Sequence, residues 1–322
     1  MKIGVVGATG YAGAELVRLL LGHPDAELVA VASRGRAGQR LDAVHPALLG
    51  CTELVFDAPD PDALAALDAV FLAVPHGTAT ELAAALDAAG APRIFDLSAD
   101  HRHAVGWVYG QTEWHARDLR DARRIAVPGC FATCIELALA PFVATGRLHG
   151  AARVVAATGS TGSGATAKAA THHPERFVNL KAYKILAHQH GPEITTFLRR
   201  LGAFDALHFV PLSAPVDRGI LATCFLQLDA GAPQDTAALT AFLAEQYADH
   251  PGVVVRSGTP ELRHVRGTAR AHLTVHADGA EVVVLSAIDN LGKGAAGQAM
   301  QCLNLSFGLP VDRGLRAPAL LP

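Results

Sequence analysis

Cys130 stands directly after Pro-Gly and opens an apolar, alanine-rich run, "VPGCFATCIELALAPF". The run has helical periodicity, so the thiol is predicted to lie at a helix N-terminus. The helix dipole there lowers the pKa of a cysteine and favours the nucleophilic thiolate. The alternative interpretation is a small buried hydrophobic residue, which is the usual role of a cysteine. We assign four cysteines to that second class: Cys51, Cys134, Cys224 and Cys302.

A catalytic thiolate needs a partner that carries a proton, and two pairs of histidines follow it. "THHPERF" contains His172 and His173, and "LAHQHGPEI" contains His188 and His190. Imidazole titrates near neutral pH and suits general acid–base catalysis. In the HxHxxE pattern the two histidines would point to the same side of a strand, and Glu193 could orient one of them. A zinc site is disfavoured, because no third ligand stands at a typical spacing and HExxH is absent.

A third signal is the glycine-rich turn in "GVVGATGYAGAEL". Gly7, Gly10 and Gly13 separate an apolar strand run from a helical run, where glycines let a pyrophosphate approach the helix N-terminus. The spacing GxxGxxG differs from GxGxxG, so the string is weak, but its place in the first βαβ unit strengthens it. A turn required only for close packing of strand and helix is the alternative.

The residues after the second expected strand indicate which dinucleotide is bound. A site that prefers NAD usually has a carboxylate there, whereas "ASRGRAG" offers Ser33, Arg34 and Arg36. A hydroxyl and two guanidinium groups suit a 2'-phosphate, so we predict NADP(H). Solvated surface arginines are the alternative.

The elements that must position these residues follow from hydrophobic periodicity. Strand-like runs "KIGVVG", "AELVAVAS", "LDAVFLAVPHG" and "PRIFDLSAD" alternate with helical runs, which predicts a Rossmann-type, doubly wound parallel sheet over the first part of the chain. After Cys130, longer alternating runs such as "GILATCFLQLDA" and "AEVVVLSAID" predict an α+β domain with a mixed or antiparallel sheet. The closing "NLGKGAAGQAMQCLNLSFGL" is a glycine turn and a helix that could pack on either domain.

Composition limits the class of function. Half of the 322 residues are hydrophobic, which favours two domains over one. Without a bilayer-spanning apolar run or a signal peptide we expect a cytoplasmic protein. The net charge of -3 and the lack of basic clusters disfavour nucleic acid and membrane as partners, so a small-molecule substrate is expected. Five scattered cysteines without CxxC indicate reduced thiols.

Together these features define a reaction class. A cysteine beside a nicotinamide forms a thioester with an acyl group, and hydride transfer interconverts that thioester with an aldehyde-level hemithioacetal. Phosphate would be the leaving group of the acyl substrate.

Eight ordered segments also carry a resemblance that covers nearly the whole chain. They resemble the N-acetyl-gamma-glutamyl-phosphate reductases of arginine biosynthesis, within the aspartate-semialdehyde dehydrogenase superfamily. The segments are "GATGYAGAELVRLL", "FLAVPHG", "DLSADHR", "VPGCFAT", "GSTGSGA", "HQHGPEI", "PVDRGIL" and "DNLGKGAAGQAMQ". With the turn glycines, Thr9, Tyr11, Ala12 and Pro75 are expected to contact the cofactor.

The resemblance implies NADPH-dependent reductive dephosphorylation of an acyl phosphate to a semialdehyde. Cys130 would be the nucleophile and His190 the acid–base residue, with Glu193 orienting it and His188 as the open alternative. Substrate or phosphate contacts are expected from Arg102, His188 and Arg218. The alternative role of the two arginines is a structural salt bridge. Ser160, Gly162 and Asn290 are expected near the nicotinamide or substrate.

The resemblance further implies a discontinuous NADP-binding domain, 1–129 and 291–322, with a catalytic and dimerisation domain, 130–290, inserted. A homodimer or homotetramer would form through the sheet of the inserted domain.

Departures from the family pattern leave alternatives open. Many members have Cys-Tyr-Pro-Thr where this chain has "CFAT", and His-Arg-His where it has "HQH", so the substrate carboxylate could be held by another residue. "HHPER" resembles the reductases of lysine biosynthesis that act on a carrier-linked aminoadipyl phosphate. A succinylated glutamyl phosphate is a third possible substrate, and an NADP-sensing regulator without turnover is the non-enzymatic alternative.

Overall fold

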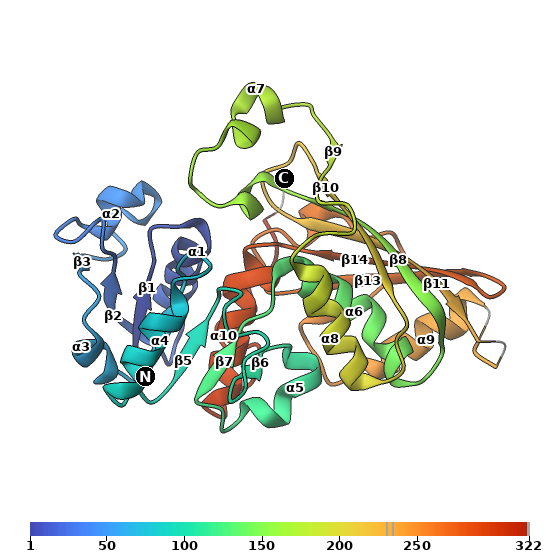
Figure 1. Cartoon of the computed structure of the whole chain (residues 1–322), viewed down its shortest axis with the longest axis horizontal. Coiled ribbons are helices and arrows are strands. Elements are labelled where there is room, and N and C mark those ends of the chain that lie inside the picture. Colours follow the sequence, from blue (N-terminus) through green and yellow to red (C-terminus); the bar gives the residue numbers. More distant parts are fainter. Residues whose placement is uncertain (230, 234, 321–322) are drawn as a thin grey trace. The chain divides into compact units, whose positions relative to one another are not determined.

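The computed structural model describes residues 1–229, 231–233 and 235–320. The chain divides into two compact units, drawn in sequence colours in Figure 1. Unit 1 comprises Met1–Gly129 and Ala295–Ala317, and unit 2 comprises Cys130–Gly294 and the residues from Pro318 onward.

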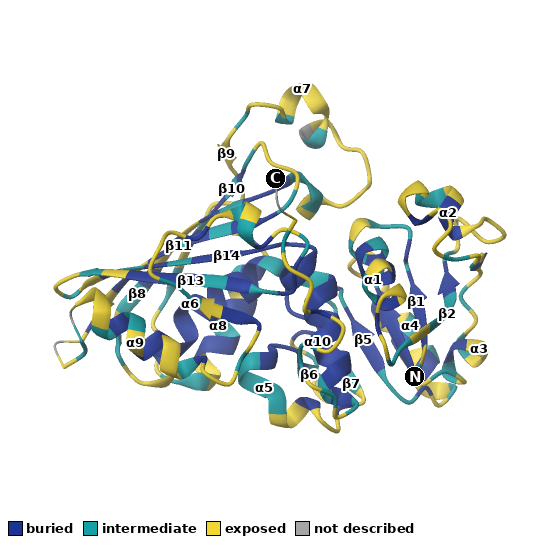
Figure 2. Cartoon of the chain, turned by 180° about the vertical axis from the view of Figure 1, so that it is seen from behind, coloured by how far each residue is buried: buried dark blue, intermediate teal, exposed yellow. Residues whose placement is uncertain are grey.

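Unit 1 is built on a seven-stranded sheet in which every pair of neighbouring strands is parallel, in the order β3-β2-β1-β4-β5-β7-β6. Strands β1, β4 and β5 are buried on both faces, as continuous apolar runs in parallel sheets are (Figure 2). The strands are β1 Lys2–Val6, β2 Glu27–Ala32, β3 Phe56–Asp57, β4 Ala69–Leu72, β5 Ile94–Asp96, β6 Val108–Tyr109 and β7 Arg124–Ala126. The helices are α1 Tyr11–Leu21, α2 Leu41–Val44, η1 Pro46–Leu48, α3 Pro61–Ala65, α4 Ala79–Ala88, α5 Thr112–Leu119 and α10 Gly297–Ser306.

The strand order reverses between β1 and β4, which is the position where doubly wound sheets bind dinucleotides. Helix α10 returns to this unit and packs against α1 and α5. The turn that precedes it is a single π-helical segment, η5, Gly292–Ala296.

Unit 2 is built on a second seven-stranded sheet, in the order β12-β13-β14-β11-β8-β10-β9. Pairs β8–β10 and β12–β13 are parallel and the other pairs are antiparallel, so the sheet is mixed. The strands are β8 Leu148–Thr158, β9 Lys181–Ala182, β10 Leu207–Ser213, β11 Ile220–Leu228, β12 Val253–Val255, β13 Ala271–Asp278 and β14 Glu281–Ile288. The helices are α6 Cys130–Ala144, η2 Ser160–Ser163, η3 Ala169–Thr171, α7 His173–Arg176, α8 His190–Leu201, α9 Thr236–Gln246 and η4 Leu262–His264.

Helix α6 is the core of unit 2. It packs against α8 and against β8, β11 and β14, and every residue from Phe131 to Val143 is buried. Burial alternates along β8 and β11, because one face of the sheet contacts helices and the other does not. The segment between β8 and the edge strand β9, which carries α7, loops out from the sheet, and most of it is exposed (Figures 1 and 2).

The predicted fold class is confirmed: a parallel, doubly wound nucleotide-binding sheet accompanies an α+β unit with a mixed sheet. No helix in the described part of the chain is both long and apolar enough to cross a membrane.

Candidate active site

Cys130 is the first residue of α6, so its backbone lies at the positive end of a 15-residue helix, as predicted. Its side chain is partly exposed. Cys134, Cys224 and Cys302 are buried, as expected of small hydrophobic residues, but Cys51 is exposed and that assignment was wrong. Cys51 lies in the loop after η1, where a short apolar pattern did not lead to burial.

The loop after β14 packs tightly against the head of α6. A Cβ built on Gly294 would lie 2.8 Å from Cys130 Cβ and 3.2 Å from its Cα. A Cβ on Gly292 would lie 2.1 Å from the carbonyl oxygen of Thr268. Since any side chain would displace backbone at these two positions, glycine is required there, and the backbone of the thiol is held in place by residues 289–294.

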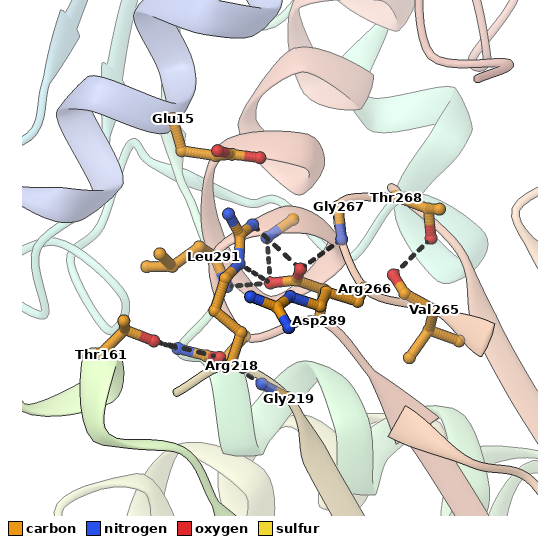
Figure 3. Close-up of polar contacts among 12 residues, drawn as sticks. Glu15, Thr161, Arg218, Gly219, Val265, Arg266, Gly267, Thr268, Asp289 and Leu291 are labelled. Atoms are coloured by element: carbon orange, nitrogen blue, oxygen red, sulfur yellow. Dashed lines mark hydrogen bonds and ion pairs between the residues drawn. The ribbon is translucent and has the colours of Figure 1, made fainter. Parts of the chain in front are cut away.

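A buried carboxylate, Asp289, organises that loop (Figure 3). Its Oδ1 accepts hydrogen bonds from Arg218 Nε at 3.1 Å and from the backbone N–H groups of Leu291 and Gly292 at 2.8 and 3.0 Å. Its Oδ2 accepts from the N–H of Gly267 at 2.6 Å and pairs with an Arg218 terminal nitrogen at 2.9 Å. Arg218 therefore forms the salt bridge that was its alternative role, and its substrate contact stays a prediction.

Asn290 joins the start of β11 to the η2 turn. Its Oδ1 accepts from the N–H of Gly219 at 2.7 Å, and its Nδ2 donates to Thr161 Oγ1 at 3.0 Å. Thr161 Oγ1 in turn donates to the carbonyl of Asp217 at 2.8 Å. The predicted residues Ser160 and Gly162 belong to the same η2 turn as Thr161, and a Cβ on Gly162 would lie 3.8 Å from Asn290 Nδ2. Three of the predicted site residues are therefore brought together here.

The histidines of "HQH" are both buried, but they do not lie on a strand as the spacing suggested. His188 precedes α8 and His190 begins it, so their relation is set by the helix start. His188 Nδ1 accepts the backbone N–H of His190 at 3.2 Å. Burial, and then the charge of Lys184, lower the pKa of His188 to about 4. His188 is therefore neutral near pH 7 with its proton on Nε2. Glu193 is buried in the first turn of α8, one helical turn after His190.

Phe131 links the histidines to the cysteine. It follows Cys130 in α6, and its ring centroid lies 5.3 Å from that of His188 and 6.1 Å from that of His190. His172 and His173 are instead exposed at α7, where His173 stacks on Phe177.

Sequence reasoning missed Tyr183, which follows β9 and whose ring lies 5.8 Å from His188. Burial, and then the charge of Cys130, raise the pKa of Tyr183 to about 12, while Arg176 acts in the opposite direction. The phenol therefore stays protonated. The only signal was its place between the two histidine motifs. Asp289 was missed as well, although it directly precedes the predicted Asn290.

The glycine turn of unit 1 has the shape of a phosphate cradle. Gly7 has φ +89°, and a Cβ there would lie 2.4 Å from the carbonyl oxygen of Ala73. A Cβ on Gly13 would lie 2.5 Å from the carbonyl oxygen of Gly7. Gly10 precedes α1 and no side chain caps the helix, so its N-terminal N–H groups fit an anion. Thr9, Tyr11 and Ala12 belong to this turn and the first turn of α1, and Pro75 follows the adjacent strand β4.

The predicted 2'-phosphate residues follow β2. Ser33 donates its N–H to the carbonyl of Asp57 at 2.9 Å, and Arg36 donates to Gln39 Oε1 at 3.1 Å. Arg34 and Arg36 are exposed, and neither forms an ion pair with any residue that the structure describes. Arg102, unlike the exposed Arg34 and Arg36, is buried in unit 1. It donates hydrogen bonds to the carbonyls of Val127 at 3.0 Å and Leu97 at 3.3 Å.

Comparison with known proteins assigns the family. A family model described as "Semialdehyde dehydrogenase, NAD binding domain" matches residues 2–122, and one described as "Semialdehyde dehydrogenase, dimerisation domain" matches residues 130–290. The N-acetyl-gamma-glutamyl-phosphate reductase of Salinispora arenicola is 43% identical over 343 residues, which cover 100% of this chain and 99% of that protein. That of Acidithiobacillus ferrooxidans is 42% identical over 346 residues and 100% of both chains.

Solved structures agree on the fold. Aspartate semialdehyde dehydrogenase II from Vibrio cholerae has a TM-score of 0.76 at 15% identity, over 94% of this chain and 97% of that chain. The Candida albicans enzyme, solved with NADP, has a TM-score of 0.71 at 15% identity over the same shares. The sequence relatives span the full chain at identities above 40%, and this chain therefore belongs to the N-acetyl-gamma-glutamyl-phosphate reductase family of semialdehyde dehydrogenases.

Proposed function

We propose that this chain reduces N-acetyl-gamma-glutamyl phosphate to N-acetylglutamate semialdehyde, with NADPH as reductant, in arginine biosynthesis. In the balanced reaction, acyl phosphate, NADPH and one proton give the semialdehyde, NADP⁺ and phosphate. The observation that carries the proposal is the partly exposed thiol at the head of α6, in a unit that also holds a neutral histidine and His190 beside Phe131.

The residues of the glycine turn fit NADP(H). Gly7 and Gly13 leave no space for a side chain between the turn and its neighbours, and the N-terminus of α1 is open to a pyrophosphate. Arg34 and Arg36 would hold the 2'-phosphate. When bound, NADPH supplies the two electrons and the hydrogen that bring an acyl thioester to the aldehyde level.

Cys130 would perform the covalent step. Its sulfur forms a bond to the acyl carbon, the carbon–oxygen bond to phosphate breaks, and phosphate leaves with the electron pair. The partial positive charge of the α6 N-terminus favours both the thiolate and the oxyanion formed on attack. After reduction, the carbon–sulfur bond breaks, the aldehyde is released and the thiolate returns.

His190 would hold the proton that these steps exchange. It would give a proton to the hemithioacetal oxygen as that oxygen gains charge, and take it back when the carbon–sulfur bond breaks. His188 is less suited to this task, because a pKa of about 4 keeps it neutral across the working range. With its proton on Nε2, His188 would instead be a hydrogen-bond donor. Glu193, buried in the same helical turn as His190, would orient that ring.

Self-association would use the exposed face of the unit 2 sheet. The matched model describes this region as a dimerisation domain. Val155 on β8 and Phe225 on β11 are exposed apolar side chains on the face away from the helices. We therefore expect a homodimer or homotetramer, measured by sedimentation, which Phe225→Glu dissociates. The reduced thiol that the mechanism needs also favours a cytoplasmic location.

The function is tested with purified protein and three acyl phosphates: acetylated, succinylated and carrier-linked. NADPH oxidation is expected with the acetylated substrate, and Cys130→Ser should lower the rate by about 10³-fold or more. Cys51→Ser is the matched control, since that thiol is exposed and is not among the proposed site residues. A Cys130→Ser enzyme that keeps the original rate would refute the covalent mechanism.

A further inference from the structure

Arg176 ends the short helix α7, on the segment that loops out from the sheet of unit 2 (Figure 1). Its guanidinium nevertheless contacts the sheet. One terminal nitrogen donates to the carbonyl of Thr158 at 3.4 Å and to that of Ala214 at 3.5 Å. Thr158 ends β8, and Ala214 directly follows its parallel neighbour β10. Both distances are at the upper limit for a hydrogen bond. These two weak contacts position the guanidinium but leave its hydrogen-bonding capacity largely unused.

The charge of Arg176 has no counterion in the described part of the chain, where no carboxylate lies within 4.0 Å of it. Its Nε is buried and makes no hydrogen bond, and the neighbouring Thr158 Oγ1 is likewise buried without a partner. Partial burial lowers the pKa of the Arg176 guanidinium, which means that its charge is disfavoured there, and an anion placed beside it would stabilise that charge.

The unsatisfied donor lies at the candidate active site. A Cβ on Gly162 would lie 3.3 Å from Thr158 Oγ1 and 3.8 Å from Asn290 Nδ2, so the end of β8 lies directly under the η2 turn. Tyr183 lies beside the buried histidines, with its ring centroid 5.8 Å from that of His188, and the charges of Cys130 and Arg176 shift the pKa of its phenol in opposite directions.

Two other cationic groups near the site, in the described part of unit 2, are already engaged. Arg218 is held by the buried carboxylate of Asp289. Lys184 donates from Nζ to Gln189 Oε1 at 2.7 Å, at the position where "HQH" has glutamine between its histidines. Position 189 therefore carries no guanidinium in this chain, and Arg176 provides one from a different segment.

We propose that Arg176 is a substrate-binding residue whose guanidinium binds an oxyanion of the acyl phosphate, its α-carboxylate or its phosphoryl group. This proposal rests on the reductase function proposed above. A planar, permanently charged donor suits either group, since both present two oxygens to a guanidinium fork.

Kinetics of Arg176→Ala and Arg176→Lys test the proposal, with Arg200→Ala, an exposed arginine of α8, as the matched control. With N-acetyl-gamma-glutamyl phosphate, Arg176→Ala should lower kcat/KM by about 10- to 100-fold, the size expected for charged hydrogen bonds, and Lys should recover part of the loss. Circular dichroism and melting curves establish that the variants are folded. If kcat/KM of Arg176→Ala stays within about twofold of that of Arg200→Ala, the proposal is wrong.

Two further arms separate the two oxyanions. If the α-carboxylate is bound, Arg176→Ala leaves the rate with 4-acetamidobutanoyl phosphate, which lacks that group, unchanged. If the phosphoryl group is bound, the variant affects both acyl phosphates equally and raises the KM for inorganic phosphate in the reverse reaction. Either pattern supports the proposal. Misfolding would produce neither, because it lowers the rate with both substrates and leaves the KM for phosphate unchanged.

Calorimetry separates this proposal from the function itself. In a Cys130→Ser background, N-acetylglutamate and inorganic phosphate are titrated with and without Arg176→Ala. If the protein with Cys130 intact shows no turnover while anion binding in the Cys130→Ser background requires Arg176, the reductase function is contradicted and the site is supported. Turnover with anion binding that ignores Arg176 would support the function and overturn the site.

Discussion

Replacing Asp289 by asparagine should strongly destabilise unit 2. The carboxylate accepts hydrogen bonds from Arg218 Nε and from the backbone N–H groups of Gly267, Leu291 and Gly292, and it forms an ion pair with a terminal nitrogen of Arg218. An amide keeps one acceptor oxygen. If that oxygen replaces Oδ1, the amide NH₂ faces two donors and Arg218 loses its counterion. Breaking a buried charge pair by removing one partner costs about 3–5 kcal/mol in the free energy of unfolding.

The matched control is Asp217→Asn, which removes the partner of Arg266 in an exposed pair, each side chain being about half accessible. An exposed pair contributes about 1 kcal/mol or less and is screened by salt. Urea unfolding followed by circular dichroism, in low salt and in high salt, should therefore give a large, salt-insensitive loss for Asp289→Asn and a small, salt-sensitive one for Asp217→Asn. Equal losses would show that Asp289 does not organise the loop.

The same substitution should also reduce catalysis, because the loop contacts the backbone of Cys130 through Gly294. We expect kcat to fall by about tenfold or more while the KM for NADPH changes little, since the cofactor turn belongs to unit 1. If Asp289→Asn keeps a normal kcat, the loop does not position the Cys130 thiol for catalysis, and this prediction is wrong.

Three other perturbations follow from the described geometry. Because the pKa of His188 falls from 6.5 to about 4 on folding, its contribution to stability is complete above pH 6.5 and is lost as the pH falls toward 4; urea unfolding should show a loss of about 2 kcal/mol between pH 7.5 and pH 5 that His188→Gln lacks. Gly13→Ala, whose Cβ would press on the Gly7 carbonyl, should raise the Kd for NADPH about tenfold by fluorescence titration, whereas Gly22→Ala at the other end of α1 should not. Replacing Arg34 and Arg36 by glutamine should weaken NADPH binding and spare NADH, and equal effects on both dinucleotides would show that these arginines do not hold the 2'-phosphate.

The sequence allowed the fold to be predicted because its signals are local. Apolar runs at a strand period, helices at a 3.6-residue period and the turn at Gly7 each report on a few neighbouring residues. The placement of Cys130 at a helix start was predictable for the same reason, from Pro-Gly followed by a helical run.

The misjudged features depend on distant parts of the chain. Asp289 organises its loop through contacts with Arg218 and Gly267, which are distant in sequence. The residues next to Asp289 give no indication of these contacts. The HxHxxE spacing fits a strand and a helix start equally well, and the packing of α8 on α6 decides between them. Cys51 shows the reverse case, an apolar residue that the fold leaves exposed.

The close contact between Gly294 and Cys130 has a consequence for how the chain is threaded. These residues are the last and first of the long segment of unit 2, so that segment leaves and re-enters the path of unit 1 at almost one point. A short peptide could therefore join its two ends, and circular permutants opened at a distant surface turn such as Gly279 should keep the sheet order of unit 2. A segment whose two ends lie this close together can be inserted into a chain without changing the strand order of the parallel sheet that it interrupts.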